Sequence, residues 1–375
     1  MLLLWLLVAT QASGVRPQYD LANYLSVAAH YRTGSPATAL REIREWRNAE
    51  IAAAVGALRK AEDRLRAVPV QANDIDFRTV EAAVLMHAEV GLIALAAMSP
   101  VDAETHLDTS LGLFEWSGLA ASRQRERASR PRKPQVALHE PAEPAAPALP
   151  IWPRIDRRDY YFALASATLA FGVPLTARPF AEEAARAAPM DAEVCLLSGC
   201  VNASLAEAFA LRHRDSDAER SREAAERKLR DALALDPGLQ EARLRLGKLL
   251  LDERRTIEAE PLLAEVDERG ADDRQRYLAR LFLGRVADLR EGHEGAARLY
   301  LRALQAWPDS QAARLALAHA LERSSGPAAA RPLVAASLAA SARLVRAPDP
   351  WWDYPFGPRG LATAALARVW GVLDR

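Results

Sequence analysis

Hydrophobic and polar residues in the stretch LFLGRVADLREGHEGAARLYLRALQAWP, residues 281–308, follow the pattern of two short helices. Apolar side chains recur at helical spacing, so each helix would have one face to bury against a neighbour. The pattern is interrupted at Arg290-Glu291-Gly292-His293, which predicts a tight turn. It stops at Pro308, which cannot continue a helix. The stretch therefore predicts an antiparallel helix pair.

Small residues stand where the two helices of this pair would touch. If Pro308 is placed near the end of a 34-residue unit, Gly284 falls at position 8, Ala296 at position 20 and Tyr300 at position 24. Small residues at positions 8 and 20 allow close packing of the two helices, and we expect the larger residue at position 24 to reach the next unit. These positions and residue types resemble the tetratricopeptide repeat (TPR).

The same spacing recurs over about half of the chain. Units with this register are predicted at 158–191, 192–239, 240–273, 277–310 and 311–344, which together form an array over 158–344. The second unit is longer than the pattern, and its charged stretch Arg212 to Ala224 would lengthen the helices or their connection. Residues Arg274 to Arg276 are predicted to separate the third unit from the fourth.

The resemblance implies an all-α fold, an α-α superhelix (TPR solenoid) of stacked antiparallel helix pairs. The first helices of such pairs line a concave groove that can hold an extended peptide or a partner helix. By resemblance, the groove positions of the last three units are Leu244, Lys248, Asp252, Leu281, Arg285, Asp288, Leu315, His319 and Arg323. A groove of this composition would suit a peptide with acidic and apolar side chains, or it could be a solvated inner face. Ser166 and Cys200, at position 9 of the first two units, argue against a clamp for carboxyl-terminal tails.

The first third of the chain, 15–121, is predicted to form further TPR-like helix pairs, one of them turning at Ser99-Pro100. A linker is predicted over 122–157, because a basic run is followed there by a proline- and alanine-rich stretch. The basic run could touch phosphate or an anionic surface, but we favour the interpretation that it is a solvated helix end.

The carboxyl-terminal region, 345–375, is predicted to be an aromatic loop followed by a capping helix. A solenoid exposes an apolar face at its end and needs a cap. The aromatic residues available for this are Trp351, Trp352, Tyr354, Phe356 and Trp370. The alternative is an aromatic platform for a sugar or a peptide.

The amino terminus bears on the compartment. An apolar run from Leu2 to Ala9, followed by small residues, predicts a signal peptide over 1–14 that is too short to be a transmembrane span. The alternative is an apolar first helix of the fold in a cytoplasmic protein. The abundance of alanine and arginine suggests a bacterial source. We therefore expect an exported protein, periplasmic or secreted, with a possible place in an envelope complex.

Charge and motifs narrow the function further. Lys and Arg number 49, as do Asp and Glu, so no nucleic acid partner is expected. No phosphate loop or catalytic motif is present, and the seven histidines lack metal-ligand spacing, so no cofactor and no metal are predicted. Cys195 and Cys200 would lie roughly 8 Å apart on one helix, beyond disulfide reach. The prediction is a non-catalytic protein-protein interaction scaffold or adaptor. The alternatives are an enzyme or enzyme subunit that docks through its repeats and a cytoplasmic TPR regulator.

Overall fold

The structure, a computed structural model, describes residues 100–129, 155–342 and 349–370, with several positions between 84 and 95. The predicted signal peptide at 1–14, the amino-terminal pairs before 84 and the Pro/Ala-rich part of the linker lie outside these residues. The side chains of Trp352, Phe356 and Trp370 also lie outside the description. The chain divides into two compact units, residues 1–160 with 363–375 and residues 161–362.

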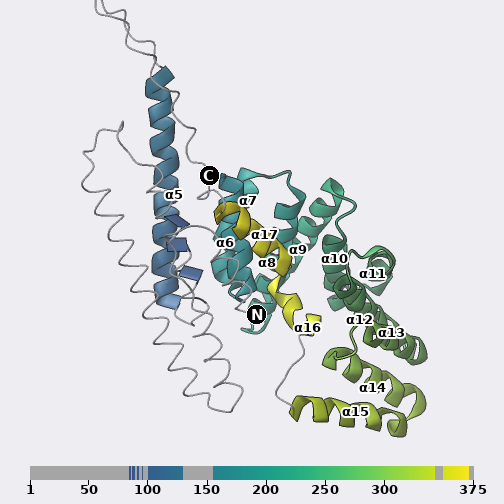
Figure 1. Ribbon diagram of the computed structural model, residues 1–375. Helices are drawn as coiled ribbons and strands as arrows, with labels where there is room; N and C mark the ends of the chain where they lie inside the picture. Colours follow the sequence, from purple (N-terminus) through teal and green to yellow (C-terminus); the bar gives the residue numbers. More distant parts are fainter. Residues whose placement is uncertain are drawn as a thin grey trace, which may run out of the picture. The chain divides into compact units, whose positions relative to one another are not determined.

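Residues 161–362 form an all-α array, as predicted (Figure 1). All of the regular structure described in this unit is helical. The helices are α6 (Arg157–Ala170), whose first residues belong to the other unit, α7 (Pro174–Ala187), α8 (Ala192–Ala210), α9 (Asp215–Leu235), α10 (Gln240–Asp252), α11 (Thr256–Arg269), α12 (Asp273–Leu289), α13 (His293–Ala306), α14 (Gln311–Ser325), α15 (Pro327–Ala342), α16 (Pro350–Asp353) and the 3-10 helix η1 (Tyr354–Phe356). The last helix, α17 (Arg359–Trp370), begins in this unit.

Consecutive helices pack in TPR-like pairs, α8 with α9, α10 with α11, α12 with α13 and α14 with α15. Each second helix also contacts the first helix of the following pair. In addition, α8 contacts α10 and α10 contacts α12, so these first helices lie side by side. We call the surface that they form, continued by α14, the A-helix face. The division of the sequence into repeat units remains a prediction.

Close approach of the two helices within a pair explains the glycines at position 8. A methyl group on Gly247 would lie 2.8 Å from the side chain of Leu263, and one on Gly284 would overlap the ring of Tyr300. Leu263 and Tyr300 are the residues at position 24, for which the sequence predicted a contact with the next unit. They pack over the glycine of their own pair, because only glycine leaves room there for a large side chain.

One detail of the array differs from the sequence prediction, and a second agrees with it. Arg274 to Arg276 are not a spacer but the first turn of α12, where the side chain of Asp272 accepts a hydrogen bond from the Gln275 amide and caps the helix. The second unit is long because its helices are long, which is one of the two predicted explanations: α8 and α9 have 19 and 21 residues. The charged stretch after Arg212 forms the short turn and the first half of α9.

The other unit contains α5 (Pro100–Ser129), which begins at Pro100, the second residue of the predicted turn. The helix continues past 122, so the first part of the basic run is helical and not linker. Ser110 is buried and bonds to the Tyr160 hydroxyl at 2.6 Å, and the ring of Phe114 stacks on that of Tyr160 at 4.0 Å. These contacts join α5 to the residues that begin α6.

Among the described residues, α8 is the helix long and apolar enough to cross a membrane by length and composition. Of its most apolar window, 61% is buried inside the structure. The apolar character of α8 is therefore used in packing against α7, α9 and α10.

Candidate functional site

Residues 349–357 lie on the A-helix face, and we call them the return segment. The Ser204 hydroxyl of α8 donates a hydrogen bond of 2.9 Å to the Pro355 carbonyl oxygen. The Arg245 guanidinium of α10 lies 3.9 Å from the centre of the Tyr354 ring, and the Trp351 ring meets Phe282 of α12 edge to face at 5.9 Å. The segment thus runs from α12 toward α8, against the order of the helices in the chain.

This position corrects the predicted cap. The aromatic residues were expected to cover the end of the array beyond the last pair, but Trp351 and Tyr354 pack on α10 and α12. The reason is that α10 offers two cations, Arg245 and Lys248, to which aromatic ring faces are attracted. The alternative interpretation, an aromatic platform open to a ligand, does not apply to Tyr354, which is buried.

Asp349 anchors the start of the return segment. Its side chain is buried, and its Oδ1 accepts hydrogen bonds from the Tyr277 hydroxyl at 2.8 Å and from the Trp351 amide at 3.0 Å. Its Oδ2 accepts from the Ser310 hydroxyl at 2.9 Å and from the Ala312 amide at 3.2 Å. None of these four donors is a cation. Neutral donors can stabilise a buried carboxylate in this way when each of its lone pairs is satisfied.

The donors to Asp349 belong to the array itself. Ser310 caps α14 by accepting from the Ala313 amide, and Tyr277 lies in the first turns of α12. Burial raises the pKa of Tyr277, and the nearby carboxylate of Asp349 adds to this, so the phenol stays protonated and can donate. The array therefore presents a carboxylate-binding position between the beginnings of α12 and α14.

Arg245 is the central contact of the return segment. It is buried, its Nε donates to Glu241 at 2.9 Å, and its Nη1 donates to the Tyr354 carbonyl oxygen. Burial alone would raise the pKa of Glu241, but the guanidinium groups of Arg245 and Arg274 outweigh it and hold that pKa below its usual value. Glu241 thus fixes the orientation of Arg245 from within the array.

Lys248 stands next to Arg245 along α10. Its Nζ bonds to both carboxylate oxygens of Asp252 at 2.6 Å and lies 5.6 Å from the ring centre of Phe282 and 5.7 Å from that of Trp351. Two neighbouring cations and one aromatic ring of the array therefore surround the aromatic side chains of the segment.

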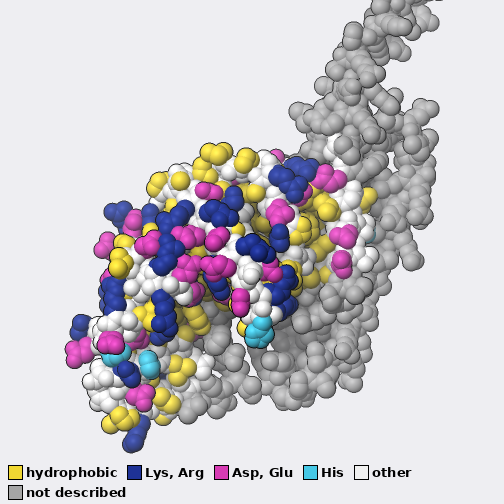
Figure 2. All heavy atoms as spheres, turned by 180° about the vertical axis from the view of Figure 1, so that it is seen from behind, with side chains coloured by type: hydrophobic (Ala, Val, Ile, Leu, Met, Phe, Trp, Pro, Cys, Tyr) yellow, Lys and Arg dark blue, Asp and Glu magenta, His cyan; other side chains and the backbone are white. Residues whose placement is uncertain are grey.

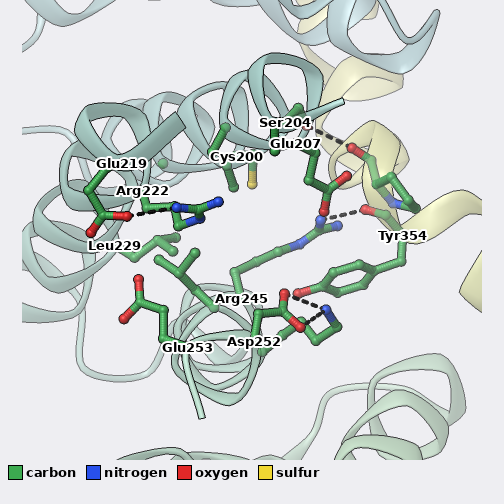
Figure 3. A pocket seen from close by; sticks show the side chains of 17 residues that line it. Cys200, Ser204, Glu207, Glu219, Arg222, Leu229, Arg245, Asp252, Glu253 and Tyr354 are labelled. Carbon is green, nitrogen blue, oxygen red and sulfur yellow. Dashed lines mark hydrogen bonds and ion pairs between the residues drawn. The ribbon is translucent and has the colours of Figure 1, made fainter. Parts of the chain in front are cut away.

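A cavity of about 550 Å³ adjoins the return segment between α8, α9 and α10 (Figure 3). Its apolar lining includes Ala203, Ala206 and Leu229. Around it lie the ion pairs Glu219–Arg222, at 2.7 Å, and Lys248–Asp252. The site is therefore larger than the part that the return segment fills.

Glu207 is the carboxylate of this cavity that has no ion-pair partner among the described residues. It reaches solvent in the cavity, yet surrounding protein atoms reduce the hydration of its charged form and raise its pKa. The positive charge of Lys248 opposes this effect.

The predicted groove residues fall into two groups. Those that solvent reaches, or that face the return segment, are Lys248, Asp252, Arg285, Leu315, His319 and Arg323. Arg285 in α12 and His319 in α14 hold the position that Lys248 holds in α10, so the A-helix face continues beyond the return segment. Leu315 is 45% exposed.

The second group consists of Leu244, Leu281 and Asp288, which are buried and offer no surface to a partner. Asp288 accepts a hydrogen bond of 2.9 Å from the Tyr300 hydroxyl and contacts His293 Nδ1 at 3.2 Å. It turns toward α13, because the phenol that packs over Gly284 needs an acceptor there. For these three residues the groove prediction does not hold.

Arg245 and Glu241, which stand beside the expected groove positions of α10, were not predicted from the sequence. Neither were Tyr277 and Ser310, because their common partner Asp349 lies far along the chain. One signal in the sequence could have predicted this contact. The segment DPWWDYPFG, residues 349–357, is acidic and aromatic, and the first helices carry cations that attract such side chains.

The Cys200 thiol at the cavity is buried. Burial raises the pKa of the Cys200 thiol, which lines the cavity, to about 11, so it remains protonated and a poor nucleophile. Among the described residues there is no group of three or more side chains suited to hold a metal ion. On the surface, basic and acidic side chains are intermixed on the face shown in Figure 2.

Comparison with solved structures finds proteins named MamA. MamA from Desulfovibrio magneticus RS-1 is 22% identical with a TM-score of 0.40, and the match covers 50% of this chain and 97% of that one. A second, MamA MSR-1, is 19% identical with a TM-score of 0.39, and covers 50% and 99% of the two chains. Neither a scan against protein families nor a search of curated proteins gives a match. At these values the likeness carries no conclusion about function.

Proposed function

We propose that this protein is a non-catalytic scaffold that binds a protein partner along its A-helix face. The observation that carries the proposal is the seating of the return segment. Side chains of α8, α10 and α12 hold it through a backbone hydrogen bond, a cation over an aromatic ring and an anchored carboxylate. The concave faces of helical repeat arrays are known to hold peptides and partner helices, and the return segment is a short helical segment of this kind.

The part of the A-helix face beyond the return segment is open to solvent. Arg285 on α12 and Leu315, His319 and Arg323 on α14 are exposed there. Arginine is enriched at protein interfaces, and an exposed leucine beside it gives an apolar contact. This composition supports a partner segment with acidic and apolar side chains.

The proposed compartment is outside the cytoplasm, with a place in an envelope complex. This part of the proposal depends on the apolar segment 1–14 alone. Mass spectrometry of the protein purified from its native organism tests it. A mature chain that begins after residue 14 supports export, whereas an intact Met1 favours the cytoplasmic alternative.

Partner capture tests the scaffold function. The full chain and an Arg285→Glu/Arg323→Glu variant would each be crosslinked in the native organism, and the crosslinked residues mapped by mass spectrometry. Arg298→Glu is the matched control, since Arg298 is an exposed arginine on the second helix α13. We expect a partner whose crosslinks lie on α12 and α14, kept by the control and lost by the double variant. Equal recovery with all three proteins would contradict the proposed surface.

A further inference from the structure

We infer that the return segment is a built-in occupant of the partner site, and that a partner segment of the same chemistry displaces it. That chemistry is a short segment with an acidic residue followed by aromatic residues and proline, as in DPWWDYPFG at 349–357, which here folds as α16 and η1. The inference rests on the proposed function, because it names the chemistry that the A-helix face recognises.

The array residues that donate hydrogen bonds to the Asp349 carboxylate keep their positions without the return segment. Ser310 caps α14, and Tyr277 is fixed by its place in α12, with or without the return segment. The Tyr277 and Ser310 hydroxyls are 2.7 Å apart and can bond to each other, but without Asp349 one of their two hydroxyl hydrogens would have no acceptor, and the Ala312 amide would lose its acceptor at 3.2 Å. Buried donors without an acceptor are costly, so the vacated position favours another carboxylate.

The aromatic position is also built by the array. Glu241 holds Arg245 through a hydrogen bond of 2.9 Å, and Asp252 holds Lys248 at 2.6 Å. Phe282 supplies a ring that meets Tyr354 edge to face at 5.3 Å. These five array residues are fixed by contacts among themselves or by helix packing, so a tyrosine or tryptophan of another chain would find the same surface.

The return segment leaves part of the site unused. The Nη2 atom of Arg245 is buried and has no hydrogen-bond partner, although its Nη1 binds the Tyr354 carbonyl oxygen. The cavity beside Tyr354 and Pro355 is also unfilled by the segment, and Glu207 faces it without an ion-pair partner among the described residues. A partner that satisfies Arg245 and enters the cavity can therefore make contacts that the chain's own segment does not make.

The tether of the return segment explains why a partner must make additional contacts to displace it. A segment of the same chain competes at an effective concentration on the order of millimolar, so an untethered copy of it binds poorly. A partner with additional contacts, or a weakened return segment, shifts this balance. The competition can be measured with a peptide of known sequence.

The probe is a fluorescein-labelled peptide with the sequence of residues 349–357, and the measurement is fluorescence anisotropy with the full chain. The variant Asp349→Ala/Tyr354→Ala removes the anchor and the stacked ring of the return segment only. We expect the peptide to bind this variant at least roughly tenfold more tightly than the unchanged chain. The control Asp309→Ala, at an exposed carboxylate before α14, should behave like the unchanged chain. A peptide with Asn and Ala in place of the residues corresponding to Asp349 and Tyr354 should not bind.

Two results would overturn the inference. One is equal peptide affinity, or none, for the double variant and the unchanged chain. The other is loss of the helical circular dichroism signal in the double variant and also in the isosteric variant Asp349→Asn, since the segment would then be part of the core of the array. If the partner capture on α12 and α14 succeeds while the peptide fails, the scaffold stands and the displacement alone is wrong. If the peptide binds while the capture fails, the site stands and the surface beyond it is wrong.

Discussion

Gly284 gives a sharp test of how the helix pairs are packed. Replacement by alanine would place a methyl group against three atoms of the Tyr300 ring, all closer than real Cβ atoms are found. The ring cannot move freely, because its hydroxyl donates to the buried Asp288 at 2.9 Å. Alanine improves helix propensity by about 1 kcal/mol over glycine, whereas overpacking a core costs about 1 to 3 kcal/mol. We expect a net loss of about 1 kcal/mol in the free energy of unfolding, because overpacking at a ring with little freedom to shift outweighs the propensity gain.

The matched control is Gly295→Ala in the partner helix α13. There the nearest atom to an added methyl group is the end of the Arg298 side chain at 3.8 Å, an ordinary contact. The control should keep the propensity gain and stabilise the protein by about 0.5 to 1 kcal/mol. Urea unfolding of both variants, followed by far-UV circular dichroism, measures the difference. Equal stabilisation by both substitutions would refute the close packing of Tyr300 over Gly284.

Three further predictions concern charge and reactivity. Arg245→Met leaves the buried Glu241 with Arg274 as its remaining cation, and should lower the unfolding free energy by about 3 kcal/mol in urea titrations. Burial and, to a smaller extent, His106 lower the pKa of His87 to about 4, so its contribution to stability is fully present above pH 6.5 and is lost as the pH falls toward 4. Between these values unfolding should become easier by about 2 to 3 kcal/mol, and His87→Phe should flatten that part of the pH profile. The Cys200 thiol, with its pKa raised to about 11, should react with iodoacetamide at pH 8 only after unfolding, as measured by mass spectrometry.

Much of the fold could be predicted because TPR-like packing depends on local residue choices. Gly247 and Gly284 stand where two helices of one pair approach, and a glycine at such a contact is visible in the sequence at a fixed spacing. Turns also carry local signals, as at Gly326, which adopts a positive φ of 86° between α14 and α15.

The site was less predictable because its contacts join distant parts of the chain. Tyr277 and Asp349 are 72 positions apart, and Ser204 and Pro355 are 151 apart. No periodic pattern links such residues, so the sequence could not place the aromatic segment on α10 and α12 and favoured a cap. The groove positions taken from the resemblance also did not account for hydrogen bonds between the two helices of one pair. Such a bond, from the Tyr300 hydroxyl, turns Asp288 away from the groove.

The most direct measurement is the position of the return segment on the array. Cysteines placed at Ser204 and Pro355, whose Oγ and carbonyl oxygen are 2.9 Å apart, would report contact between α8 and the segment. A parallel pair at Arg331 and Pro355 would report a cap over α15. The structure predicts that mild oxidation crosslinks the first pair and not the second, with Cys200 protected by burial. Crosslinking of the second pair alone would contradict the seating of the segment on the A-helix face.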